Sequence, residues 1–259
     1  MFLKKTLLLS ISLLFLSCGN KKKDLLAIAP INQHTIVTQS SKSKKIQHTK
    51  WDALLKKHVA ENGDVDYKNF KKDISKLDTY LQYLGGNTLS KNAAKEERLA
   101  YYINLYNAAT IKLILDKYPL KSITRIWRPW GKARIKIGDE LYSLSTIEHE
   151  VLRKMNEPRI HFAINCASYS CPKLLNEAYT ASRLEEQLQK VTINFINDKT
   201  KNTYTKEFAK LSKIFKWYEE DFTKNGSLIN YINRYKKTTL PVHTKIEYLS
   251  YDWSLNEAK

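Results

Sequence analysis

The stretch that decides the fold is LAYYINLYNAATIKLIL, residues 99–115. Its apolar side chains would fall on most sides of a helix, which is typical of a helix buried in the centre of a domain. Ser90 is suited to open this helix, and Pro119 cannot continue it. The pattern therefore predicts a long helix from Ser90 to about Lys117.

Two amphipathic helices are predicted before this central helix. Thr49 is suited to cap the first, whose apolar residues within 51–59 share one side. In the second, apolar residues within 70–84 recur at spacings of four and three, and Gly85-Gly86 ends the pattern.

Several segments after the central helix have strand patterns. Residues 133–137 alternate in polarity, and the following Gly-Asp pair suits the turn of a β-hairpin within residues 123–142. Further strands are predicted at 159–165, 211–217 and 245–251.

Other patterns in this half of the chain predict helices. Residues 145–148 and 182–185 have the form of capping boxes, which open helices. Pro172 suits the first turn of a helix, and a last helix is predicted at 228–235. The sum is an α+β fold, mostly helical with a small sheet, and residues 46–259 are expected to form one domain.

The first residues have the order of an export signal. Residues 6–16 are almost entirely apolar, a run that fits a signal peptide but is too short to span a membrane. Leu16-Ser17-Cys18-Gly19 resembles the lipobox of bacterial lipoproteins, in which the cysteine after the cut carries the lipid. Residues 1–17 are therefore predicted to be a lipoprotein signal peptide, and 18–45 a lipidated Cys18 with a flexible polar tether. The alternative is an ordinary secretory signal.

This start predicts an exported protein, lipid-anchored to the bacterial cell envelope and expected at the outer membrane. The formal net charge of +18 would suit nucleic acid, but an envelope location and the lack of a nucleic-acid motif argue against it. We therefore expect attachment to the membrane through Cys18 and an envelope substrate or protein partner. No Gly-rich phosphate loop occurs, and no cofactor is expected.

Residues that can carry chemistry gather between Glu148 and Cys171. Cys166 follows a predicted strand at a turn, where backbone N–H groups can stabilise a thiolate and later an oxyanion. A thiol nucleophile needs a base, for which His149 and His161 are the candidates. On a regular strand His161 and Cys166 would point to opposite faces, so the pattern favours His149.

The remaining candidates each have a commoner structural role. Glu148 is suited to orient an imidazole, but its commoner role is that of the last residue of the capping box, where it would bind the backbone at the start of the helix. Asn104, Asn107 or Asn165 would supply a third, orienting group, against the commoner role of a hydrogen-bonded core amide. For His161, with its apolar neighbours, a buried structural role is likewise commoner.

Two other interpretations compete for the same residues. Once Cys18 is lipidated, Cys166 and Cys171 are the two cysteines left, and an oxidising compartment favours a disulfide between them. A zinc site from His161, Cys166, Cys171 and His149 matches no standard ligand spacing, and no metal is predicted.

Several stretches together resemble the family catalogued as domain of unknown function 547. They are residues 101–108, 143–153, 158–168 and 171–172. The resemblance covers roughly residues 97–217, and the ending 251–256 is similar to exported members. The family's recurring residues match at Asn104, Asn107, Glu148, His149, Arg153, His161, Cys166, Cys171 and Pro172. The resemblance implies no particular activity.

The site also resembles papain-like and transglutaminase-like cysteine enzymes, in which the nucleophilic cysteine begins a helix and the histidine lies on a neighbouring strand. The leading interpretation is a cysteine-dependent hydrolase or acyltransferase acting on amide or thioester bonds, with Cys166 as nucleophile. The alternative is a non-enzymatic envelope binding or scaffold module. In that case a Cys166–Cys171 disulfide is structural, and a hairpin with Trp127 and Trp130 binds a partner or glycan.

Overall fold

The computed structural model describes residues 45–90, 92–205 and 207–259. The predicted signal peptide, the lipidation site at Cys18 and all but the last residue of the predicted tether lie outside the described residues. The described residues belong to one unit of the chain. They are mostly helical, as the sequence predicted, and they contain two small sheets where one was expected.

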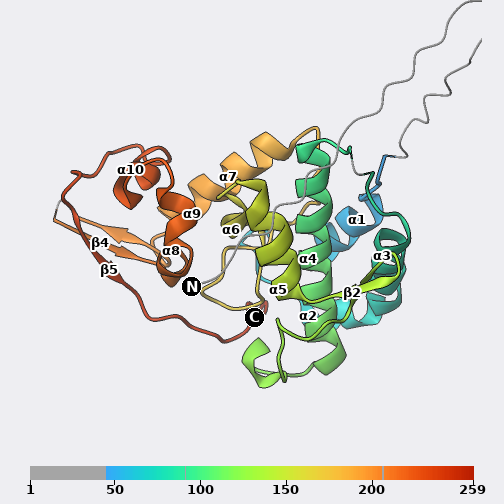
Figure 1. The fold of residues 1–259 in the computed structure, drawn as a ribbon. Helices are drawn as coiled ribbons and strands as arrows, with labels where there is room; N and C mark the ends of the chain where they lie inside the picture. The colour runs from blue at the N-terminus through green and yellow to red at the C-terminus, as the bar shows by residue number, and fades with distance from the viewer. Residues whose placement is uncertain (1–44, 91, 206) are drawn as a thin grey trace, which may run out of the picture. The chain divides into compact units, whose positions relative to one another are not determined.

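The predicted central helix is α4, Lys95–Lys117, and most of its residues are buried. It starts five residues later than predicted, because the Ser90 hydroxyl accepts a bond from the Asn92 backbone in the preceding loop and Ala94 occupies the cap position. Figure 1 shows α4 between α1 and α3 on one side and α5, α6 and α7 on the other. Although α4 is long, none of the helices in the described part has both the length and the hydropathy needed to cross a membrane.

The helices before α4 follow the prediction with one break. They are α1 (Thr49–His58), α2 (Tyr67–Phe70), the 3₁₀ turn η1 (Lys71–Asp73) and α3 (Ile74–Gly86). Near the end of α3, a Cβ on Gly85 would lie 2.5 Å from the carbonyl oxygen of Lys136, so only glycine lets the hairpin approach this closely. The Gly138 N–H donates to the Gly85 carbonyl at 2.8 Å.

The two sheets lie at different parts of the chain. The predicted hairpin is β1 (Ile135–Ile137) paired antiparallel with β2 (Glu140–Tyr142). The second sheet has the order β3 (Thr203–Tyr204), β4 (Phe208–Leu211) and β5 (Lys245–Tyr248), with β3–β4 antiparallel and β4–β5 parallel. The strand predicted at 211–217 is wrong, because the Ser212 hydroxyl accepts from the Ile214 N–H and starts a helix there.

The remaining helical elements are short, apart from α7. They are η2 (Ile123–Arg125), α5 (Leu144–Thr146), η3 (Ile147–Leu152), η4 (Arg153–Met155), α6 (Ile160–Ala163), α7 (Leu184–Asn197), α8 (Lys213–Trp217), α9 (Glu219–Thr223) and α10 (Leu228–Asn233). The capping box predicted at 182–185 is not formed, since no side chain caps α7 and Glu185 pairs with Arg159 instead.

The strand predicted at 159–165 is also wrong. The four residues of α6, Ile160–Ala163, form one helical turn and are all buried. Their continuous burial comes from a position in the core and not from a place in a sheet. No helix follows Pro172 either, because the Asn165 amide donates to the Pro172 carbonyl and holds this segment as a loop. The expected likeness to papain finds no support, since Cys166 begins no helix and His161 lies on one.

Candidate functional site

A cavity of about 360 Å³ brings together most of the residues singled out in the sequence. Glu148, His149, His161, Cys166 and Cys171 all line it. Aromatic side chains complete the wall, namely Tyr106, Trp130, Trp217, Tyr218, Tyr251 and Trp253. The cavity therefore combines a thiol, two imidazoles and a carboxylate with largely apolar surroundings, which is the usual character of a small-molecule site.

Asn107 on α4 fixes the backbone that leads to Cys166. Its amide N–H₂ donates to the Ala163 carbonyl at 2.9 Å, and its carbonyl accepts from the Asn165 N–H at 2.8 Å. Asn107 is buried and does not line the cavity. The sequence proposed it as a catalytic candidate, whereas the structure gives it a positioning contact.

Asn104, one turn earlier on α4, makes the same kind of contact elsewhere. Its amide donates to the Tyr179 carbonyl at 2.8 Å and accepts from the Tyr179 N–H at 3.0 Å. Replacing either Asn104 or Asn107 by alanine leaves two buried backbone groups without their partner, so each variant is expected to lose about 2–3 kcal/mol of unfolding free energy. Urea denaturation measures this loss.

The two variants are expected to differ at the thiol. Asn107→Ala should alter the alkylation rate of Cys166, because Asn107 holds the adjoining backbone. Asn104→Ala is the matched control, since its contact lies at Tyr179. Equal alkylation rates in the two variants would contradict the positioning role of Asn107.

A second amide shapes the loop around Cys166. The Asn165 side chain accepts from the Ala167 N–H at 2.8 Å, and Ala167 has a positive φ of 59°. The C-terminal segment then holds the far side of this loop, where the Tyr169 N–H donates to the Ser254 carbonyl at 2.7 Å. The Ala167 N–H is therefore engaged and is not free to donate to an oxyanion.

The Cys166 sulfur is surrounded by hydroxyl groups. It lies 3.2 Å from the Ser168 hydroxyl and 3.2 Å from the Tyr251 hydroxyl. Because Ser168 donates to the Tyr251 oxygen at 2.9 Å, the Tyr251 hydroxyl proton is available to the sulfur. The Tyr251 hydroxyl is therefore the group placed to stabilise negative charge on the sulfur.

Cys171 lies against Cys166, and both are free thiols in this structure. The Cys166 N–H donates to the Cys171 sulfur at 2.8 Å. Hydrogen bonding from the Cys171 side chain lowers the pKa of Cys166 despite burial, with Ser168 and Tyr251 acting in the same direction. Burial raises the pKa of the Cys171 thiol. The geometry thus favours one thiolate, on Cys166, and the disulfide stays a prediction.

The pKa of Cys166 is expected to depend on the donor at position 171. Cys171→Ala removes this donor and should move the midpoint of the alkylation rate of Cys166 to higher pH, because less thiolate is present at a given pH. Cys171→Ser keeps a donor and should shift the midpoint less. Iodoacetamide kinetics between pH 5 and 10 measure the midpoint in both variants. Identical midpoints in the two variants would contradict the assigned hydrogen bond.

His161 is held at the cavity by Asp221, a residue that the sequence did not suggest. The His161 Nε2 atom lies 2.8 Å from the Asp221 carboxylate, and the ring stacks on Tyr218 with centroids 3.9 Å apart. Nδ1 is buried and has no hydrogen-bond partner among the described residues. Burial lowers the pKa of His161, with Asp221 acting against this, so the imidazole is neutral and able to accept a proton at neutral pH.

Arg153 completes the support of Asp221. Its guanidinium makes two bonds to the carboxylate, of 2.6 Å and 3.1 Å. Burial opposes ionisation of Asp221, but bonds from His161 and Arg153 hold the pKa of Asp221 well below its usual range. A carboxylate that is charged at neutral pH therefore fixes the His161 ring.

The other sequence candidates, His149 and Glu148, are engaged differently. The Arg153 guanidinium lies 3.1 Å from His149 Nδ1. This nitrogen of His149, the base that the sequence favoured, is therefore already in contact with a cation. The predicted capping box is wrong, because Ser143 caps α5 two residues earlier. Glu148 is thereby left to accept hydroxyl bonds from Tyr106, at 3.1 Å, and from Tyr218.

The described ranges offer no metal centre at this cavity. Within residues 45–90, 92–205 and 207–259, no three His, Cys, Asp or Glu side chains are grouped so that they could hold an ion. The zinc interpretation of His161, Cys166 and Cys171 therefore has no geometric support.

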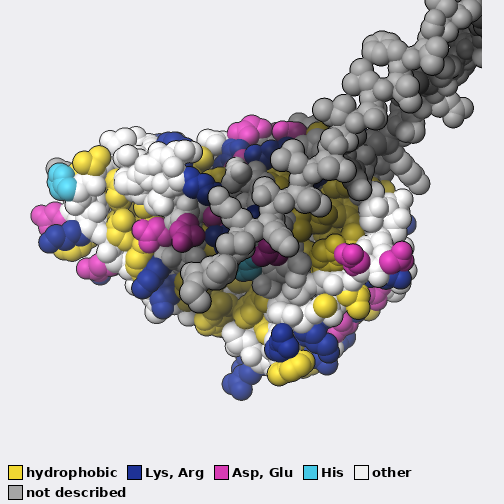
Figure 2. Space-filling view, in the orientation of Figure 1, with side chains coloured by type: hydrophobic (Ala, Val, Ile, Leu, Met, Phe, Trp, Pro, Cys, Tyr) yellow, Lys and Arg dark blue, Asp and Glu magenta, His cyan; other side chains and the backbone are white. Residues whose placement is uncertain are grey.

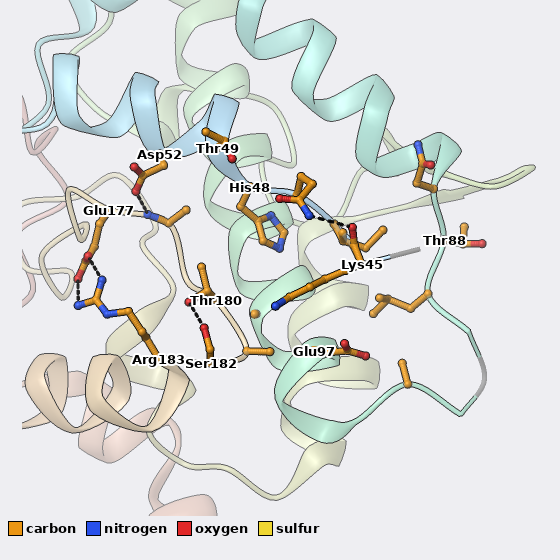
Figure 3. Close-up of a pocket in the computed structure, with 18 of the residues that line it drawn as sticks. Lys45, His48, Thr49, Asp52, Thr88, Glu97, Glu177, Thr180, Ser182 and Arg183 are labelled. Carbon is orange, nitrogen blue, oxygen red and sulfur yellow. Dashed lines mark hydrogen bonds and ion pairs between the residues drawn. The ribbon is translucent and has the colours of Figure 1, made fainter. Parts of the chain in front are cut away.

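A larger cavity of about 800 Å³ has a different character (Figure 3). Two pairs of its charged side chains bind each other, Lys56 with Asp52 at 2.7 Å and Arg183 with Glu177 at 2.6 Å. His48 there bonds Tyr80 at 2.7 Å, and burial lowers the pKa of His48 to about 4. Its described lining includes no cysteine, and its one histidine is bonded to a tyrosine hydroxyl, so we do not assign it the chemistry.

Trp127 and Trp130, the tryptophans of the alternative interpretation, have different environments. Trp127 is 70% exposed, and the cations of Arg128 and Lys132 lie 5.5 Å and 5.8 Å from its ring centroid. Trp130 instead lines the thiol cavity and packs on Trp253. Figure 2 shows hydrophobic side chains beside Lys and Arg at the lower edge, where Figure 1 places the segment before β1.

Fold and cavity together define a mostly helical domain with a thiol, an imidazole and a buried carboxylate at one site. Residues 90–196 match the family described as "Protein of unknown function, DUF547", so the chain contains a DUF547 domain. No curated protein and no solved structure matches the chain. Cys166, His161 and Asn107 fall within the matched residues, whereas Asp221 and Tyr251 lie beyond them.

Proposed function

We propose that the protein is an exported, lipid-anchored enzyme of the cell envelope that transfers or hydrolyses acyl groups through Cys166. The observation that carries this proposal is that the Cys166 thiol and the His161 imidazole line the same cavity, and that Asp221 holds the Nε2 atom of His161. A nucleophile, a base and a group that orients the base are the parts that cysteine-dependent acyl transfer requires.

The reaction would proceed in two steps. The proton of Cys166 passes to His161 Nδ1, and the sulfur attacks the carbonyl carbon of an amide or thioester. A new thioester to Cys166 forms, while the bond to the leaving amine or thiol breaks, and His161 returns the proton to that leaving group. Water or another acceptor then attacks the thioester carbonyl carbon while His161 takes its proton. The carbon–sulfur bond breaks, and His161 returns the proton to the Cys166 sulfur.

The environment of the sulfur supports the charge development in these steps. The Tyr251 hydroxyl, 3.2 Å from the sulfur, is placed to donate to an oxyanion formed next to it. Burial raises the pKa of Tyr251, so this hydroxyl keeps its proton. The aromatic walls give the cavity a largely apolar lining, and its volume leaves room for a substrate of modest size.

The direct test uses the purified mature chain and an aryl thioester. We expect an acyl adduct on Cys166, detected by intact mass and peptide mapping, that forms faster than on the urea-unfolded chain. Cys166→Ala should form no adduct, whereas Cys171→Ser should. Equal thioester turnover by the wild type and Cys166→Ala would contradict the proposal.

The second candidate is the non-enzymatic binding module of the envelope. The exposed Trp127 with its two flanking cations favours it, because tryptophan and arginine are the side chains that most often dominate binding interfaces. The two functions differ at Cys166: a binding module would tolerate Cys166→Ala and lose its function on Trp127→Ala.

A further inference from the structure

Four aromatic side chains form a continuous surface in the thiol cavity. Trp253 is their centre, because its ring centroid lies 5.5 Å from that of Trp130 and 5.8 Å from that of Trp217. The Tyr251 ring centroid lies 4.4 Å from that of Trp253 and 4.7 Å from that of Trp217. All four residues line the cavity. We call them the aromatic cluster.

The aromatic cluster extends from the nucleophile to the protein surface. At one end, the Tyr251 hydroxyl lies 3.2 Å from the Cys166 sulfur. At the other end, the Trp217 side chain is 44% exposed. A group attached to the Cys166 sulfur would therefore meet apolar ring surface directly beside the sulfur.

The cavity offers no cation to a negatively charged acyl group. Among the described residues that line it, none is Lys or Arg, although the chain contains 44 of them. Burial lowers the pKa of His161, so that this ring is uncharged at neutral pH. A guanidinium can only donate, so the Nδ1 atom of His149, 3.1 Å from Arg153, accepts and carries no proton.

The cavity offers no free anion to a positively charged acyl group either. Glu148 is the carboxylate in the described lining, and it is buried. Its two oxygens accept from different hydroxyls, Oε2 from Tyr106 at 3.1 Å and Oε1 from Tyr218. Cys166 itself loses its charge once it is acylated. A charge of either sign on the acyl group would thus be taken out of water without a partner, which is costly.

We propose that the acyl group transferred to Cys166 is uncharged and apolar, and that the aromatic cluster selects it. This inference rests on the proposed acyl-transfer function and names the substrate class of the same site. The cavity volume of about 360 Å³ lies at the small end of the range of ligand sites, which favours a short acyl chain.

Acylation of Cys166 by a series of phenyl thioesters tests the size and polarity of the acyl group. Each thioester transfers its acyl group to the sulfur and releases thiophenol, and rates are divided by those of the urea-unfolded chain to correct for intrinsic reactivity. We expect the hexanoyl thioester to react at least about tenfold faster than the acetyl thioester, because its additional methylene groups are buried.

A matched pair of acyl groups tests the charge alone. The 5,5-dimethylhexanoyl and 4-(trimethylammonio)butanoyl groups have the same shape and differ by one atom, a carbon in place of a charged nitrogen. We expect the cationic group to react at least about tenfold more slowly. The adipoyl thioester, which carries a carboxylate, should likewise react at least about tenfold more slowly than the hexanoyl thioester.

Substitution of Trp217 tests the role of the aromatic cluster. Because Trp217 is partly exposed, Trp217→Ala should fold, which circular dichroism verifies. We expect its preference for hexanoyl over acetyl to fall about fivefold or more, whereas Trp217→Phe should retain most of it. Leu141→Ala is the matched control. It removes a hydrophobic side chain that is 62% exposed and outside the cavity, so the preference should change less than about twofold.

The outcomes separate this inference from the function on which it rests. If no thioester acylates Cys166, the proposed function fails and the inference fails with it. If acylation occurs but acetyl and hexanoyl react equally fast, or the cationic group reacts as fast as its neutral counterpart or faster, the inference alone is overturned. Equal loss of preference in Trp217→Ala and Leu141→Ala would also overturn it.

Discussion

A strain whose only copy of the protein carries Cys166→Ala is expected to show the full phenotype of a strain that lacks the protein. The sulfur forms the covalent intermediate in the proposed reaction, so no residual acyl transfer remains once it is removed. The measurement is complementation of the deletion, with immunoblots to verify equal amounts of each variant in the membrane fraction.

Cys171→Ser is the matched control for this experiment. It also removes one of the two neighbouring thiols and prevents a disulfide, yet it keeps a hydrogen-bond donor beside the Cys166 sulfur. Partial or full complementation is expected for Cys171→Ser. Full complementation by Cys166→Ala would rule out the enzymatic account, and failure of both variants would point to the disulfide as the functional feature.

His161→Asn is expected to slow acylation of Cys166 by about 10²- to 10⁴-fold, the range that loss of a general base produces. The reason is that His161 lines the cavity and its Nδ1 atom has no hydrogen-bond partner among the described residues, while Asp221 holds Nε2. Stopped-flow acylation by an aryl thioester, at a pH where the thiol is mostly protonated, measures the effect.

His149→Asn is the matched comparison, because it removes the second imidazole of the same cavity. Since Arg153 already occupies Nδ1 of His149, this variant is expected to slow acylation by less than about tenfold. A larger effect of His149→Asn than of His161→Asn would assign the base to His149, as the sequence pattern favoured. Circular dichroism of both variants verifies that the fold is retained.

The central part of the fold could be predicted because its pattern is local. The apolar run of residues 99–115 and the Gly-Asp turn after residue 137 have few structural alternatives, and α4 and the β1–β2 hairpin lie where they were expected. Similarly, the clustering of Glu148, His149, His161 and Cys166 within a short span of sequence was visible before the structure, and all four line one cavity.

The histidine that partners Cys166 could not be predicted correctly, because the choice between His149 and His161 relied on a strand that does not exist. Residues 159–165 were assigned to a strand from their short apolar run, and a short apolar run does not distinguish a strand from a buried helical turn. Since 160–163 form α6 instead, the argument that set His161 and Cys166 on opposite faces no longer holds.

Asp221 was missed for a different reason. It lies 60 residues after His161, within the acidic run Glu219-Glu220-Asp221 that resembles a solvated helix start. Only tertiary packing reveals that this carboxylate is paired with His161 and Arg153. The role of Tyr251 was also missed. Tyr251 belongs to the C-terminal ending that is similar to exported family members, but nothing in the sequence indicates that its hydroxyl lies against the Cys166 sulfur.

The most direct test of the account is the intact mass of the mature chain before and after brief iodoacetamide treatment under native conditions, at pH values on both sides of neutrality. The account predicts a fully reduced protein with one rapid label on Cys166 and slow or no labelling of Cys171, whose pKa is raised by burial. A protein two hydrogens lighter that takes up no label would contradict the account, because Cys166 and Cys171 would then form a structural disulfide.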